Sequence, residues 1–175
     1  MKLVIQRVLS ASVALAANTN PALASATVAA PASAEARSIG PGLLVLVGLH
    51  KTDDRSLIEQ LSRKLVNIRL FEDDEQRPWR QSVKQNNLEI LLVSQFTLYA
   101  RTHKGTKPDF SHAMKTDDAL KLFDAFAEAV SAEHSADKVK VGFFGQHMQI
   151  SSVNDGPVTL TIERHTDGES DRIKN

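Results

Sequence analysis

The stretch Val153-Asn154-Asp155-Gly156-Pro157-Val158-Thr159-Leu160 decides how the fold is interpreted, because it places a Gly-Pro pair between turn-forming residues and a β-branched segment. Proline lacks a backbone donor and fixes φ, so it interrupts a strand ladder. We therefore expect two short strands, Met148 to Val153 and Val158 to Arg164. An X-Pro bond is also the one peptide bond whose cis form costs only about 1 kcal/mol. Taken alone, Gly156-Pro157 is typical of a tight turn between strands.

A second stretch, Leu91-Leu92-Val93-Ser94-Gln95-Phe96-Thr97-Leu98, is apolar, then abruptly polar, then apolar again. We expect a central strand over residues 88–98, in which Ser94 faces one way and Gln95 and Thr97 face the other. Polar side chains in such a strand need partners or water. Two interpretations stay open: a strand end that emerges at the surface, or a pocket rim that offers hydroxyl and amide groups to a polar substrate.

The composition fits one globular domain. The chain has 175 residues, with 21 Lys plus Arg and 21 Asp plus Glu, so the formal net charge is zero. That balance argues against a protein that coats nucleic acid by its overall field, but it leaves room for a local grip on one RNA end. No cysteine is present, which excludes disulfides and a thiol nucleophile. No run reaches the roughly 18 apolar residues of a membrane span, and Gln6 and Arg7 interrupt a signal-like N-terminus, so we expect a cytoplasmic protein.

Alternating strand and helix patterns predict an α+β (mixed α/β) fold with the order β-β-α-β-β-α-β-β-β. Besides the segments above, the expected strands lie at 3–8 with a continuation over 11–15, and at 43–49, 69–71 and 139–144. Helices are expected at 55–67, capped by Thr52 or Asp53, and at 119–133, capped by Thr116 or Asp117. We expect one domain over 1–165, an Ala-rich hairpin insertion at about 16–38 and a polar tail at 166–175. On the second helix the expected inward residues are Leu120, Phe123, Phe126, Ala127 and Val130.

Familiar catalytic patterns are missing from the chain. There is no Gly-x-Ser-x-Gly elbow and no Walker loop. His103, His112 and His147 lack metal-ligand spacing, so the sequence predicts neither a metal nor a cofactor. Thr97 is a nucleophile in principle, but no histidine or lysine adjoins it in the sequence, and we expect it to position the substrate.

A basic loop follows the polar stretch. Arg101, Lys104 and Lys107 fall within ten residues of it, with a glycine between them. Such a loop is either an ordinary solvated segment or a grip on RNA phosphates beside the pocket.

With both stretches in hand, the chain resembles the D-aminoacyl-tRNA deacylases, also called D-tyrosyl-tRNA deacylases. The family's signatures are a Ser-Gln-x-Thr-Leu strand and an Asn-x-Gly-Pro-Val-Thr segment, which stand here at 94–98 and 154–159. The likeness runs from Met1 to about Ile162. The Ala-rich insertion and the polar tail depart from the family pattern, and neither touches a signature.

The resemblance implies a homodimer with barrel-like sheets and two helices, which hydrolyses the ester between a D-amino acid and the 3′ end of tRNA and also accepts glycyl-tRNA. In the Asn154 segment, Gly156-Pro157 would be cis and would enter the partner's pocket. Its carbonyls would hold the substrate's α-ammonium, and an L side chain would collide with this backbone.

The resemblance also implies roles for the polar stretch. Ser94, Gln95 and Thr97 would line and orient the ester, while the terminal adenosine's 2′-hydroxyl activates water. Phe96 belongs to the same substrate-binding set. Phe110 or Phe144 would flank the adenosine, and a core role for these phenylalanines stays open.

Two alternative functions remain. One is an animal-type tRNA deacylase of relaxed chirality that acts on tRNA mischarged with L-alanine. That subgroup has a Pro-Gln-x-Thr signature and a trans Gly-Pro bond, and the serine at position 94 of this chain disfavours it. The other is a non-catalytic nucleic-acid-binding dimer on the same scaffold, which the zero net charge disfavours for broad duplex binding.

Overall fold

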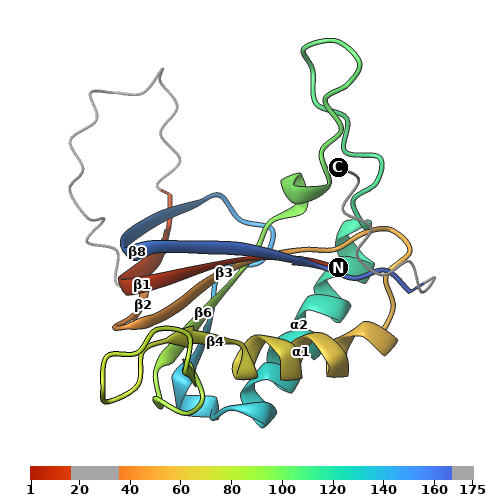
Figure 1. Ribbon diagram of the computed structural model, residues 1–175. Helices are drawn as coiled ribbons and strands as arrows, with labels where there is room; N and C mark the ends of the chain where they lie inside the picture. Colours follow the sequence, from red (N-terminus) through yellow and green to blue (C-terminus); the bar gives the residue numbers. More distant parts are fainter. Residues whose placement is uncertain (17–35, 167–175) are drawn as a thin grey trace, which may run out of the picture.

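The computed structural model describes residues 1–16 and 36–166, so the predicted insertion and tail lie almost wholly outside the described residues. Two helices cover one face of a curved sheet (Figure 1). The elements follow one another as β1 (Lys2–Leu15), β2 (Arg37–Ile39), β3 (Gly42–Gly48), α1 (Ser56–Asn67), β4 (Arg69–Phe71), β5 (Gln81–Ser82), β6 (Glu89–Ser94), the 3-10 helix η1 (Phe96–Tyr99), α2 (Thr116–Glu133), the 3-10 helix η2 (Ala136–Lys138), β7 (Val139–Val141) and β8 (Met148–Glu163). The predicted α+β fold class is confirmed.

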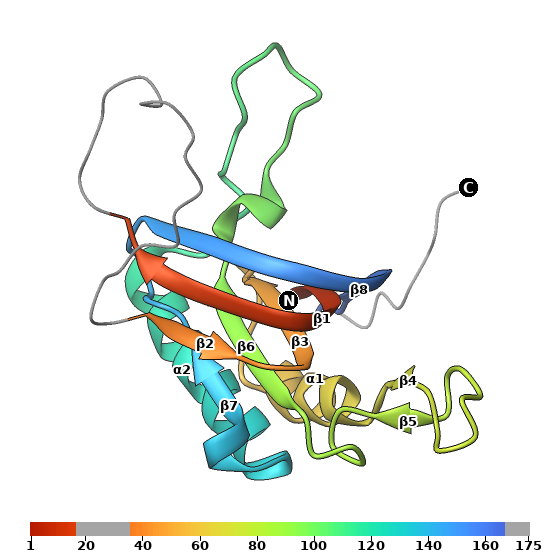
Figure 2. The same cartoon turned by 90° about the vertical axis from the view of Figure 1, so that its left-hand side faces the viewer.

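Strand β1 organises the sheet because both of its edges are used. One edge pairs antiparallel with β3 and further along with β2, and the other pairs with β8 over almost its whole length. The sheet continues from β3 through β6 to β7. The Arg37 guanidinium on β2 donates to the carbonyls of Val141 and Gly142, 3.1 Å away in the second case, so β2 lies against β7. The sheet thereby curls into a nearly closed barrel (Figure 2).

The parallel pair of β3 and β6 forms the centre of the core. Alternate side chains, such as Val45 and Leu92, face the helices, and their neighbours Leu44 and Leu91 face a second cluster inside the curl of the sheet. A strand buried on both faces needs an almost continuous apolar run, and the predicted strand at 43–49 has one. The predicted strand at 139–144 is shorter than expected, and the two-residue strand β5 was not predicted.

The helices confirm the expected segments but not the expected caps. Helix α1 follows Arg55 and α2 follows Lys115, and neither N-cap residue makes a side-chain capping bond. Asp53 is not a cap because its carboxylate turns inward to the Met1 amino group, 2.6 Å away. Leu120, expected to point inward, is 40% exposed, while Leu122 is buried in its place. Within the described ranges, no helix is long and apolar enough to cross a membrane.

The expected break at Pro157 does not divide the last strand, because β8 runs without interruption from Met148 to Glu163. The reason lies in the pairing with β1, where Gln6 is opposite Thr159 and Val8 is opposite Asn154. Residues 155–158 therefore bulge out opposite Arg7 alone. In a bulge no ladder partner requires a proline N–H, so the chain tolerates proline without ending the strand.

Candidate functional site

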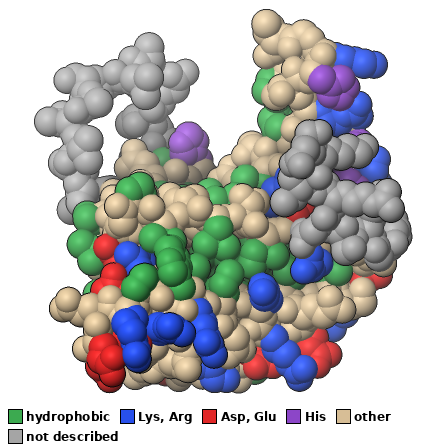
Figure 3. Space-filling model, in the orientation of Figure 1, with side chains coloured by type: hydrophobic (Ala, Val, Ile, Leu, Met, Phe, Trp, Pro, Cys, Tyr) green, Lys and Arg blue, Asp and Glu red, His purple; other side chains and the backbone are tan. Residues whose placement is uncertain are grey.

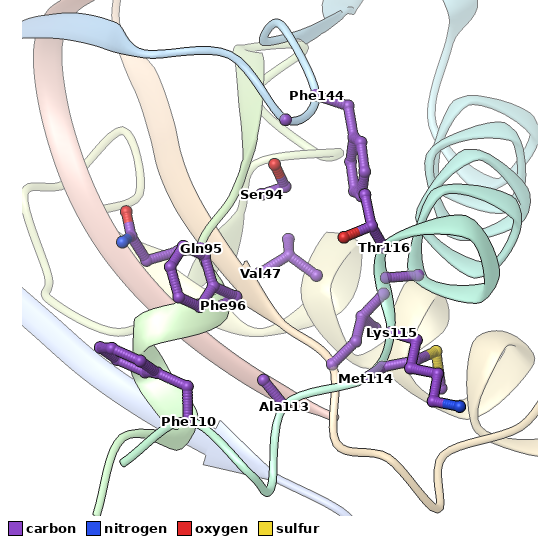
Figure 4. Close-up of a pocket in the computed structure, with 13 residues that line it drawn as sticks. Val47, Ser94, Gln95, Phe96, Phe110, Ala113, Met114, Lys115, Thr116 and Phe144 are labelled. Carbon is purple, nitrogen blue, oxygen red and sulfur yellow. The ribbon is translucent and has the colours of Figure 1, made fainter. Parts of the chain in front are cut away.

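A cavity of about 400 Å³ opens where the parallel strands β3 and β6 end. Val47 supplies its floor from β3, Ser94 its polar edge from β6, and Phe144 one wall. Figure 4 shows the Ser94 and Gln95 side chains diverging at this edge. The carboxyl ends of parallel strands are the usual place for a ligand in an open sheet, because the chain leaves the sheet there and exposes side chains and backbone.

The polar stretch does not continue as a strand beyond Ser94, contrary to the prediction for 88–98. The backbone N–H of Gln95 donates to the Val47 carbonyl at 2.8 Å, which is the last hydrogen bond between β6 and β3. The chain then turns into η1. The turn packs Leu98 so closely on Gly48 that a Cβ at Gly48 would lie 2.9 Å from the Leu98 Cβ. The expected strand conformation of residues 95–98 is therefore wrong, although Gln95 and Thr97 still lie together on one side, as expected.

This turn brings two predicted site residues into contact. The Gln95 Nε2 donates to the Thr97 Oγ1 at 2.5 Å. Gln95 belongs to the cavity lining, whereas the exposed Thr97 lies just outside it. The Gln95 carboxamide is thus held in one orientation and keeps its oxygen as an acceptor for another group.

Aromatic side chains flank the mouth of the cavity. Phe96 and Phe110 meet edge to face, with ring centroids 5.0 Å apart, and they are 57% and 37% exposed. Phe144 also lines the cavity but packs on Phe123 of α2 in the core. Exposed rings at a polar cavity are suited to stack a nucleobase. Phe96 and Phe110 fit that task better than Phe144.

The start of α2 forms a wall that the sequence reasoning missed. Lys115 and Thr116 line the cavity, and Figure 4 shows the Thr116 hydroxyl pointing toward it while the Lys115 ammonium points away from Ser94 and Gln95. The N-terminus of a helix carries partial positive charge and free N–H groups. The Thr-Asp-Asp sequence at 116–118 marked a helix start and was the available signal.

The Gly156-Pro157 pair lies outside the cavity of its own chain. Its peptide bond is cis, as the resemblance implied. Both residues and Asn154 are exposed, and none of them lines the cavity. Gly156 has φ +113°, and a Cβ there would lie 2.8 Å from the Val158 Cγ2, so glycine is required at this position.

The Gly-Pro bulge is tied to the body of the protein by one arginine. The Arg7 Nε lies 2.8 Å from the Asp155 Oδ2, and the Arg7 Nη1 donates to the Leu70 carbonyl at 2.8 Å. The same guanidinium lies over the Phe71 ring, 5.9 Å from its centroid. The bulge on β8 is thereby fixed relative to β4.

The predicted phosphate-binding residues lie on a loop that projects from the molecule beside η1 (Figure 1). Arg101 sits at its base, where its backbone pairs with that of Asp109 and its guanidinium contacts His103 and His112. Lys104 and Lys107 are exposed nearer the tip. Figure 3 shows basic and histidine side chains along this projection. Arg101 therefore shapes the loop, and the two lysines are presented to solvent.

The described residues that line the cavity include no histidine and no carboxylate. Hydrogen bonds from the backbone and side chain of Ser111 lower the pKa of Asp109, which keeps this carboxylate charged beside Arg101. Burial raises the pKa of the Tyr99 phenol in η1, so this group stays protonated at neutral pH. Among the described cavity-lining residues, Lys115 alone has a titratable side chain.

Comparison with known proteins defines the class. A family model described as D-Tyr-tRNA(Tyr) deacylase matches residues 4–163. The D-aminoacyl-tRNA deacylase of Chlorobium phaeobacteroides is 44% identical over 166 residues, which cover 95% of this chain and 99% of that protein. The Drosophila melanogaster protein of the same name is 47% identical and covers 77% of this chain and 84% of its own length. The human D-aminoacyl-tRNA deacylase 1 is 37% identical over 96% of this chain and 72% of that protein.

Solved structures share the fold of this chain. A structure titled c-Myc DNA Unwinding Element Binding Protein has a TM-score of 0.80 and 38% identity, covering 94% of this chain and 99% of its own. Another, of a probable eukaryotic D-amino acid tRNA deacylase, has a TM-score of 0.69 over 92% and 97% of the two chains; at 16% identity it supports the fold alone. The class is that of ester hydrolases. The chain belongs to the D-Tyr-tRNA(Tyr) deacylase family, which confirms the resemblance seen in its sequence.

Proposed function

We propose that the chain hydrolyses the ester bond of D-aminoacyl-tRNA. Water adds to the ester carbonyl, the bond to the ribose oxygen breaks, and the ribose oxygen takes up a proton, which releases free D-amino acid and tRNA. The observation that carries the proposal is the family match over 4–163 together with a cavity edged by Ser94 and Gln95, two residues of the family signature. A cytoplasmic location, where charged tRNA is used, is part of the proposal.

The proposed mechanism uses positioning and no general base from the protein. Gln95, held by Thr97, and Ser94 orient the ester, and the 2′-hydroxyl of the terminal adenosine activates the attacking water. Support comes from the cavity lining, whose described residues include no histidine and no carboxylate. Thr97 as a nucleophile is the competing mechanism. Its exposure outside the lining and its hydrogen bond to Gln95 favour the positioning role.

The proposed source of chiral selection is the Gly156-Pro157 backbone of a partner subunit. Its carbonyls bind the α-ammonium, so that an L side chain would point into the main chain, whereas the hydrogen of glycyl-tRNA fits. The pair is exposed on its own chain and lies outside that chain's cavity, which suits entry into a second copy.

A homodimer is the second requirement of this proposal. Strand β8 is exposed along most of its length. Val153, which pairs with Ser10, is 55% exposed, and Leu9, in the irregular register of β1 beside it, is 53% exposed. A band of hydrophobic side chains crosses the middle of the molecule at the level of the sheet (Figure 3). A second copy packed here would bury these side chains, which supports association.

The deciding experiment compares hydrolysis of D-tyrosyl-tRNA and L-tyrosyl-tRNA by the purified protein, with its mass in solution measured in parallel. We expect a dimer that cleaves the D ester and leaves the L ester intact. Equal cleavage of both enantiomers, or an active monomer, contradicts the proposed selection. L-alanyl-tRNA included in the same assay tests the relaxed-chirality alternative, which Ser94 disfavours because that subgroup carries proline there.

Nucleic-acid binding without hydrolysis is the second candidate function. It is favoured by the name of the structural neighbour at 38% identity, a DNA unwinding element binding protein. If the protein binds DNA or RNA tightly but leaves D-tyrosyl-tRNA intact, this candidate replaces the first. The proposed RNA grip by Arg101, Lys104 and Lys107 belongs to both candidates and therefore does not distinguish them.

A further inference from the structure

Three side chains that the mechanism does not use converge behind the cavity wall. His50 follows β3, Asp53 lies in the loop before α1, and His165 comes just after β8. One potential ligand atom from each lies within 4.8 Å of the others. The His50 and His165 rings stand nearly perpendicular, with centroids 5.8 Å apart. Imidazole nitrogens and a carboxylate oxygen in one cluster are the ligand types that transition-metal ions select.

Backbone contacts hold the three residues in place independently of any ligand. The Met1 and Arg164 backbones bond to each other, which fixes the end of β8. The Thr166 hydroxyl donates to the Thr52 carbonyl at 3.0 Å and fastens the segment after β8 to the loop before α1. The fold therefore holds His50, Asp53 and His165 close together before any metal ion binds.

Asp53 supplies the observation that points to a cation. It is only 7% exposed, and its Oδ2 accepts from the His50 amide at 2.7 Å and pairs with the Met1 amino group at 2.6 Å. Its Oδ1 is buried without a hydrogen-bond partner among the described residues. A buried carboxylate oxygen with no donor costs free energy, and a metal ion removes that cost.

The two histidines are oriented as metal ligands are. The His50 Nδ1 lies 2.8 Å from the Thr52 Oγ1 and 3.3 Å from the Thr52 amide nitrogen, and Nε2 can bind a metal in the tautomer whose Nδ1–H donates to the Thr52 hydroxyl. The His165 Nε2 lies 3.3 Å from the Glu163 Oε1, which leaves Nδ1 and provides a carboxylate partner for the ring. Such outer partners fix the ring and raise its basicity.

We propose that His50, Asp53 and His165 bind one divalent transition-metal ion, with Zn²⁺ as the best fit to two imidazoles and one carboxylate. Ligand atoms at about 2.0–2.2 Å from one ion lie about 3.5 Å apart, so binding requires side-chain shifts on the order of 1 Å. The ion takes the Oδ1 of Asp53, while the Met1 amino group keeps the Oδ2.

The proposed ion braces the cavity wall and takes no part in ester hydrolysis. His50 forms an isolated bridge with Ala113, and the Met114 amide donates to the Leu49 carbonyl at 2.9 Å. Ala113, Met114 and Leu49 all line the cavity. An ion that links the His50 loop to the end of β8 therefore restrains the segment that shapes this wall, and its main effect is on stability.

The test titrates untagged protein, freed of metal by a chelator, with Zn²⁺ by calorimetry and with Co²⁺ by visible absorption. We expect one equivalent to bind, a low-coordinate Co²⁺ spectrum, and a rise of several degrees in Tm on Zn²⁺ addition. His165→Ala and His165→Gln weaken binding at least tenfold, whereas His147→Ala, an exposed histidine outside the cluster, binds as the unmodified chain does.

Absence of saturable one-to-one binding in the unmodified chain overturns the proposal. So does binding that survives both His165 substitutions. Because metal binding and Tm are measured without tRNA, their outcome is independent of the proposed deacylase activity.

Discussion

The Arg7 Nε lies 2.8 Å from the Asp155 Oδ2, and the same guanidinium donates to the Leu70 carbonyl at 2.8 Å. One side chain of β1 therefore positions the bulge of β8 that carries Gly156-Pro157. Arg7→Met is expected to lower kcat/KM for D-aminoacyl-tRNA about tenfold to hundredfold, because a hydrogen bond to a charged group contributes about 1.5–3 kcal/mol. The measurement is deacylation of D- and L-tyrosyl-tRNA.

Asp155→Asn retains the shape but loses the charge, and it should reproduce part of the Arg7→Met effect. A double-mutant cycle isolates the coupling between the two residues. Arg63→Met removes exposed ion pairs with Glu59 of α1 and Glu133 of α2, and it serves as the matched control with unchanged activity. Full activity of Arg7→Met would contradict the proposed role of Arg7 in positioning the Gly156-Pro157 bulge.

Gln95 and Thr97 distinguish positioning from nucleophilic catalysis. Gln95→Ala should lower kcat by about 10- to 1,000-fold, the range for loss of one preorganised group around a reacting carbonyl. Thr97→Val keeps the shape but removes the hydroxyl that accepts from Gln95. We expect Thr97→Val to lose about as much activity as Gln95→Ala and no more.

A complete loss in Thr97→Val, with an acyl-enzyme trapped in the unmodified protein, would instead establish Thr97 as the nucleophile. Gln146→Ala, an exposed amide outside the cavity, is the control.

The Phe96–Phe110 pair is expected to bind the terminal base of the tRNA. Alanine at either position should raise KM about 5- to 100-fold with a smaller change in kcat, since stacking of one base contributes about 1–3 kcal/mol. The control is Trp79→Ala, which removes an aromatic ring of 55% exposure on the loop between β4 and β5. An equal effect of all three substitutions would mean that the pair has no special role.

The lysines on the projecting loop are expected to contact phosphates. Lys104→Glu and Lys107→Glu should each weaken tRNA binding and reduce the slope of log K against log salt by about 1. Lys64→Glu on α1 makes the same charge change on an exposed residue away from the cavity. If its effect on the salt slope matches that of the loop variants, the binding is not localised to the loop.

Helix α2 offers a stability test of the corrected helix face. Phe126 is fully buried, so Phe126→Ala should lower the free energy of unfolding by about 3–5 kcal/mol. Leu120 is 40% exposed, and Leu120→Ala should cost less than about 1 kcal/mol. Urea unfolding followed by circular dichroism measures both values. A larger loss for Leu120→Ala would restore the original expectation that this residue points inward.

Local sequence patterns predicted the family and the positions of the core strands and the two helices. The run at 43–49 is apolar without interruption, which is the pattern that a strand buried on both faces requires. The Ser-Gln-x-Thr-Leu and Asn-x-Gly-Pro-Val-Thr segments identified the family because their residues and order are specific. These features depend on residues that are neighbours in the chain, so they can be recognised from the sequence without knowledge of the fold.

Features that depend on neighbours distant in the chain became visible only in the folded structure. The turn after Ser94 follows from the end of β3 and the packing of Leu98 on Gly48, so the run of residues 94–98 could not reveal it. Pro157 sits within an unbroken strand because β1 leaves a gap in the register opposite Arg7. His50, Asp53 and His165 have no ligand spacing in the sequence, and they meet only because β8 ends beside the loop that follows β3. The pairing of strands that are distant in the sequence sets which of these residues meet, and the local order of polar and apolar residues does not contain that information.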